Sequence, residues 1–168
     1  MGSIPITRSS PNAPVWAQTL SDMIKIRSPL EKMAGCYYLG RLTDKIRLEL
    51  AGQLSDDYRP YLFHRHGADT QFMNYFGLAK EEIVEAVKAS NNDDAGMAAW
   101  FVQRTGLDEK KLNTWNELAV NLGKQGHPMA KTLIWAKENL LPHCTDPSID
   151  TDFKAIEWDE GRLPRRPV

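Results

Sequence analysis

The stretch GRLTDKIRLELAG at residues 40–52 constrains the fold more than any other, because it fits two periodicities. Residues 46–50 alternate between apolar and charged types, as a half-buried β-strand does. Apolar residues also recur at helical spacing, namely Leu39, Leu42, Ile46 and Leu50. The residue types favour a helix, and Gly52 stands where a left-handed helix cap is expected. We therefore predict a helix here rather than a strand.

Residues that start and end helices recur along the rest of the chain. Ser28, Pro29 and Glu31 form a capping box, which predicts a short helix that ends at Gly35. The other predicted N-caps are Asp69, Asp93 or Asp94, and Asp108, and the other predicted helix ends are Gly77 and Gly106.

Residues 128–142 are predicted to form the last helix, between two prolines. Its predicted buried stripe consists of Met129, Leu133, Ala136 and Leu140. No pair of strands is recognisable, so the predicted fold class is all-α. We expect a compact single-domain bundle of about six to eight short helices, with a long central loop at residues 53–68 and an irregular C-terminal tail. Residues 1–14 are predicted to be a flexible lead-in, 15–162 the helical domain and 163–168 a tail.

Composition excludes several functional classes. The 168 residues carry 21 basic and 22 acidic side chains, so no overall field attracts nucleic acid or an anionic membrane. No apolar run is long enough to span a bilayer, and the N-terminal stretch is too polar for a secretory signal. Cys36 and Cys144 lie far apart without a CxxC motif. We expect a soluble cytoplasmic protein without a cofactor, with room for a homodimer interface.

The charges of the 39–50 helix allow two interpretations. Arg41, Asp44 and Lys45 share a face with Leu48, opposite the apolar stripe. The simpler interpretation is a solvated face with weak charge pairs. If Leu48 is instead covered, Arg41 and Lys45 are partly buried and need anionic partners, either protein carboxylates or a ligand.

Two further groups are candidates for chemistry. His64, His66 and Asp69 form an HxH with a nearby carboxylate, which is a weak candidate metal site, and exposed imidazoles beside a capping Asp69 are the preferred interpretation. Trp115 and Asn116 lie on a predicted helical stripe, where they belong either to the core or to the edge of a cleft. No motif for a hydrolase, kinase or dinucleotide-binding enzyme is present.

Several segments resemble a family of small bacterial proteins known as domain of unknown function 5069. They include IRSPLEKMAG, GRLTDKIRLELAGQLSDDYRP, GADTQFMNYFGL, WNEL, KQGHP and IDTDFKAIEWDEGR, and the order and spacing agree from about Arg27 to Arg162. The resemblance implies a small, mostly helical protein without an established activity. It also implies a set of recurrent polar positions. These are Arg41, Lys45, Arg47, Asp57, Tyr58, Asp69, Trp115, Asn116, Asp159, Glu160 and Arg162. Residues 64–66 depart from the family pattern, which weakens the metal hypothesis.

Two functional hypotheses follow. The first is a non-catalytic binding or interaction module in which the Tyr58 loop and the DEGR segment fold back onto the basic helix, so that Asp159 and Glu160 neutralise its cations. The second is a small enzyme or binding protein for an anionic metabolite. There Arg41, Lys45 and Arg47 would clamp a phosphate or carboxylate, with Asp69 or Glu160 as general base.

Overall fold

A computed structural model of the chain describes residues 25–165, so the predicted lead-in at 1–14 lies outside the described residues. Seven α-helices, one short 3-10 helix and no strand occur in this range, which confirms the all-α prediction. None of the helices in this range is long and apolar enough to cross a bilayer. The elements are α2 (Leu39–Leu50), η1 (Arg59–Tyr61), α3 (Ala68–Phe76), α4 (Lys80–Ala89), α5 (Asp94–Thr105), α6 (Glu109–Ala119), α7 (Ala130–Asn139) and α8 (Asp152–Asp159).

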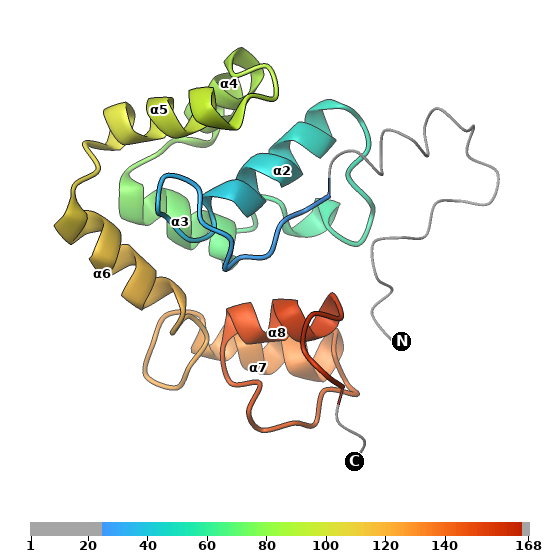
Figure 1. Cartoon of the computed structure of the whole chain (residues 1–168). Coiled ribbons are helices and arrows are strands. Elements are labelled where there is room, and N and C mark those ends of the chain that lie inside the picture. The colour runs from blue at the N-terminus through green and yellow to red at the C-terminus, as the bar shows by residue number, and fades with distance from the viewer. Residues whose placement is uncertain (1–24, 166–168) are drawn as a thin grey trace.

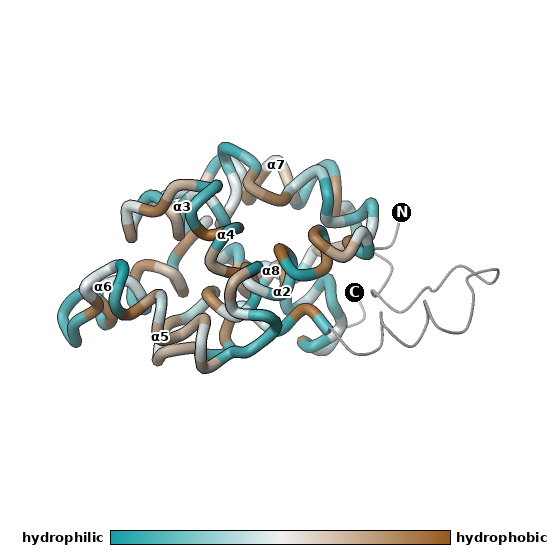
Figure 2. The backbone as a smooth tube through the Cα atoms, turned by 90° about the horizontal axis from the view of Figure 1, so that it is seen from above, coloured by the Kyte–Doolittle hydropathy of each residue, from teal (hydrophilic) through white to brown (hydrophobic). Residues whose placement is uncertain are grey.

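The predicted helix at the opening stretch is α2, and it occupies a central place in the molecule. In Figure 1, α3 to α6 curve around α2 on one side, and α7 and α8 lie together on another side. Figure 2 shows the arrangement from above, with α2 and α8 near the middle and α7 along one edge. Residues far apart in sequence therefore meet around α2.

The main hydrophobic core forms where α2 to α6 converge. Phe72 of α3, Phe101 of α5 and Trp115 of α6 are fully buried, and the centroid of the Phe72 ring lies 5.6 Å from that of Phe101 and 5.2 Å from that of Trp115. The α2 stripe joins this core through Leu39, Leu42 and Ile46. Leu50 was predicted to belong to the stripe, but it is exposed because α2 ends there.

A second face of α2 is also covered. Leu48 packs with Ile26 and Leu54 in a separate small cluster. The charged residues Arg41, Asp44, Lys45 and Arg47 are also buried, with 3–8% exposure, so the interpretation as a solvated face is wrong.

Two local predictions are also wrong for identifiable reasons. Residues 29–35 form turns rather than a helix, because Met33 and Cys36 exchange two backbone hydrogen bonds around Gly35, whose φ is +73°. The N-cap of α3 is Gly67, and Asp69 lies buried in the first helical turn. By contrast, the side chains of Asp93 and Asp108 cap α5 and α6 as predicted.

The C-terminal segment contains one helix more than predicted. Thr151 caps α8 by accepting a hydrogen bond from the backbone N–H of Lys154. Phe153 of α8 enters the main core, whereas Ala155 and Trp158 join a second cluster with Leu133 of α7. This packing accounts for the helix despite its short length, since isolated eight-residue helices are unstable in water.

The start of α8 lies against the turn that follows α6. The backbone N–H of Asp152 donates to the carbonyl of Leu122, and Gly123 has a φ of +86°. A Cβ atom at Gly123 would lie 2.9 Å from the backbone nitrogen of Asp152 and 3.0 Å from Leu133. Only glycine permits this close approach.

We expect Gly123→Ala to lower the free energy of unfolding by about 3 kcal/mol or more, because it adds a backbone clash to a left-handed conformation. Gly126→Ala is the matched control, since Gly126 has a φ of +84° with no atom near the added Cβ. It should cost only about 1 kcal/mol. Chemical denaturation of both variants measures the difference, and equal losses would contradict the close-approach argument.

Candidate functional site

A cleft of about 1170 Å³ lies at the junction of α2, the segment 56–69, α7 and α8. Its floor carries Tyr38, Arg41 and Lys45, and its rim carries the exposed aromatic rings of Tyr61 and Trp135. It is therefore the place where most of the predicted polar residues could act together.

One wall of the cleft is the apolar stripe of α7. Met129, Leu133, Ala136 and Leu140 were predicted to be buried, yet only Leu133 is, with 5% exposure. All four line the cleft instead. The stripe is thus incompletely covered by protein.

The first ion pair of the floor joins α2 to the residue after α8. Arg41 donates two hydrogen bonds to the carboxylate of Glu160, at 3.1 and 2.6 Å, and a third to the backbone carbonyl of Arg27. The hydroxyl of Tyr58 donates to the same carboxylate at 2.5 Å, and Arg162 also pairs with it. Burial opposes both charges, but the pairing keeps the pKa of Glu160 below its usual range and that of Arg41 above it.

The second ion pair joins α2 to α3. Lys45 lies 2.5 Å from a carboxylate oxygen of Asp69, and that oxygen accepts a hydrogen bond from the Tyr38 hydroxyl at 2.8 Å. The other oxygen accepts from the backbone N–H of Phe63. Burial lowers the pKa of Lys45, and Asp69 opposes this shift. Asp69 is thereby fully engaged as a buried counter-ion and is not the helix cap that its position suggested.

Two carboxyl groups of α8, those of Asp152 and Asp159, are not paired with a cation within residues 25–165, as Glu160 and Asp69 are. Asp152 and Asp159 both line the cleft. Burial, together with nearby Asp69, raises the pKa of Asp152 to about 6 against the attraction of Arg41 and Lys45. Burial and the neighbouring Glu160 raise the pKa of Asp159 to about 6 as well. Groups that titrate near neutrality in a cleft are candidates for function.

Several predicted residues lie away from this cleft. Arg47 binds Asp94 at 2.7 Å on another side of α2. Asn116 accepts a hydrogen bond from the backbone of Tyr37 and donates one to Gly35, while the Trp115 indole N–H donates to the Tyr37 carbonyl. Trp115 and Asn116 therefore hold the turn before α2. Arg162 stands behind Glu160 and donates to Glu157 as well.

The proposed metal ligands do not converge. His64 and His66 are exposed at the rim, with ring centroids 5.8 Å apart, and Asp69 points to Lys45. Among the described residues, no group of three or more His, Cys, Asp or Glu side chains is arranged to hold a metal ion.

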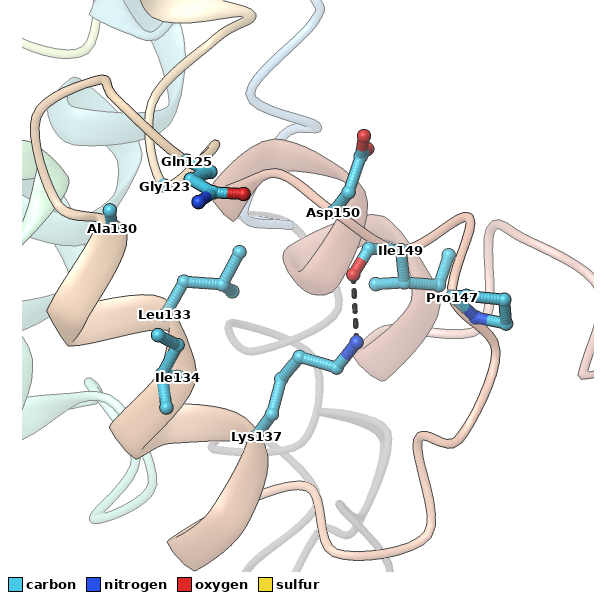
Figure 3. A pocket seen from close by; sticks show the side chains of 9 residues that line it. All are labelled: Gly123, Gln125, Ala130, Leu133, Ile134, Lys137, Pro147, Ile149 and Asp150. Atoms are coloured by element: carbon cyan, nitrogen blue, oxygen red, sulfur yellow. Dashed lines mark hydrogen bonds between the residues drawn. The ribbon is translucent and has the colours of Figure 1, made fainter.

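A smaller hollow of about 450 Å³ lies between α7 and the segment before α8 (Figure 3). Its charged groups are already engaged, because the Lys137 ammonium donates to the Ile149 carbonyl and Asp150 pairs with Lys154. This hollow is accordingly a weaker candidate than the large cleft.

Asp152 is not among the residues predicted for the site, although the sequence contains a usable pattern. Asp152, Ala155, Ile156 and Asp159 follow the i, i+3, i+4, i+7 spacing of one helical face, and all four line the cleft. The pattern becomes informative only once Thr151 is recognised as an N-cap.

A family model described as a domain of unknown function (DUF5069) matches residues 24–162. A comparison with curated protein sequences gives no match.

We expect Arg41→Ala to lower the free energy of unfolding by about 3–5 kcal/mol, because it leaves Glu160 buried without its main counter-ion. Arg59→Ala is the control: Arg59 forms ion pairs with Asp56 and Glu49 but is about half exposed. It should cost less than about 1 kcal/mol. Denaturant titrations measure both values. An unchanged stability for Arg41→Ala would exclude a structural role for the pair.

Asp152→Asn should raise stability at pH 7.5. A carboxyl group whose folded-state pKa is raised opposes folding when ionised, so removing it gains about 1–2 kcal/mol above pH 6. This gain should disappear between pH 6 and pH 4, as wild-type Asp152 becomes protonated in the folded state. Asp150→Asn is the control, because Lys154 lowers the pKa of Asp150. Melting temperatures across this pH range test the prediction, and a constant difference would contradict it.

Proposed function

The chain belongs to the family described as a domain of unknown function (DUF5069), and from the geometry of this member we propose that it is a non-catalytic module that binds a small molecule in its large cleft. The observation that carries the proposal is the composition of the cleft: an apolar wall on α7 faces polar groups of α8 and the floor. Small-molecule sites combine these features, with mostly apolar walls and a few polar groups that fix orientation.

The paired charges of the floor support a binding role over a catalytic one. Glu160 is held by Arg41, Tyr58 and Arg162, and Asp69 is held by Lys45. A carboxylate engaged in this way is a poor general base, because its lone pairs are occupied, and in Glu160 the pairing also lowers the pKa.

The alternative, a clamp for an anionic metabolite, has less support. It needs Arg41, Lys45 and Arg47 to converge on one anion. Arg47 lies outside the cleft lining, and the other two already bind carboxylates of the protein. An anion would have to displace Glu160 or Asp69, and the displaced carboxylate would remain close by.

A ligand screen tests the binding proposal. We expect at least one compound from a set of amines, neutral alcohols and carboxylates to raise the melting temperature of the wild-type protein, because a ligand that binds only the folded state stabilises it. Ala136→Trp, which fills the cleft from α7, should abolish the shift. Ala89→Trp, at an exposed position on α4, is the control and should retain it. Absence of binding, or binding that persists in Ala136→Trp, would contradict the proposal.

A further inference from the structure

The charge balance of the cleft favours a cationic ligand. Six carboxylates and three cationic side chains line it. Two of the three cations, Arg41 and Lys45, are neutralised by Glu160 and Asp69 within the floor. The third, Lys131, is an exposed residue of α7. Of the other four carboxylates, Asp56 pairs with Arg59. Asp57, Asp152 and Asp159 then face Lys131 alone within the lining, so the remaining surface of the cleft is acidic.

Two of these carboxyl groups also lack hydrogen-bond partners. Among the described residues, the Asp152 side chain forms no hydrogen bond but is partly exposed to solvent, whereas the Oδ1 atom of Asp159 is buried without any partner. Buried carboxylate oxygens normally have donors, because losing hydration without replacement is costly. An ammonium group offers three donors together with a compensating charge.

Asp152 and Asp159 both lie on the face of α8 that borders the cleft. Asp152 and Asp159 are seven residues apart, so they lie on one helical face about 10 Å apart along the axis. Ala155 and Ile156 lie between them in the cleft lining, and the incompletely covered stripe of α7 forms the other wall. A ligand that satisfies both walls has a cationic group and an apolar body.

We propose that the cleft binds an amine with an apolar body, whose ammonium group is held by Asp159 of α8 and whose hydrocarbon part packs on α7. The half-exposed rings of Tyr61 and Trp135 at the rim add faces that attract a cation. This inference rests on the proposed binding function and specifies its ligand class.

A set of three compounds with nearly the same body isolates the role of charge: 2-phenylethylamine, 2-phenylethanol and 3-phenylpropanoate. We expect isothermal titration calorimetry to give the tightest binding for the amine. Asp159→Asn should weaken amine binding about tenfold, the size of a lost charge-assisted hydrogen bond, and leave alcohol binding nearly unchanged. Asp152→Asn, about 10 Å away on the same helical face, should weaken amine binding less. Asp150→Asn is the control, since Asp150 lies outside this cleft and should have no effect.

The outcomes separate the two proposals. If the alcohol or the carboxylate binds at least as tightly as the amine, and Ala136→Trp abolishes this binding, the amine inference is wrong and the binding module stands. The inference also fails if amine binding is undiminished in Asp159→Asn. If none of the three compounds binds, the inference fails with these probes, and the wider screen decides the binding function. Circular dichroism of each variant establishes that a lost affinity does not reflect unfolding.

Discussion

The ion pair between Arg41 and Glu160 is the contact on which the cleft depends. Arg41 belongs to the central helix, Glu160 follows the last helix, and Tyr58 of the long 53–68 segment donates to the same carboxylate. Three parts of the chain therefore meet at one buried charge. Removing any partner leaves the others desolvated, and a buried unpaired charge is far more costly than an exposed one. The pair thus fixes where α8 lies and which of its faces borders the cleft.

The paired charges in the floor of the cleft stabilise the fold, whereas the carboxyl groups on the α8 wall are available to a ligand. In the floor, each of two carboxylates has a cation and a tyrosine hydroxyl, so its hydrogen-bonding capacity is used within the protein. On α8, Asp152 and Asp159 have raised pKa values, and the buried Oδ1 atom of Asp159 has no donor among the described residues. Such groups lower the free energy of unfolding of the free protein. Natural proteins retain destabilising groups of this kind mainly at functional sites.

Helices that begin and end at recognisable capping residues could be predicted from the sequence. Turns, and ion pairs between residues far apart in the sequence, could not. α5 and α6 begin at capping aspartates and α5 ends at a glycine, so local chemistry was sufficient. The predicted helix after Ser28 failed because its capping box competes with a tight turn at Gly35. The role of Asp69 was missed because its partner, Lys45, is 24 residues away, and the partner of Arg41 is 119 residues away.

The stripe of α7 shows why the site itself escaped prediction. A helical apolar stripe indicates a face that avoids water, but it does not specify what covers that face. Here neighbouring helices bury Leu133 and leave Met129, Ala136 and Leu140 bordering the cleft. The opposing helix α8 packs Ala155 against Leu133 and places Asp152 and Asp159 on the same cleft-lining face, so it covers only part of the stripe. An occupant that is apolar on one side and cationic on the other fits both helices, whereas a water-filled cleft satisfies only the acidic one.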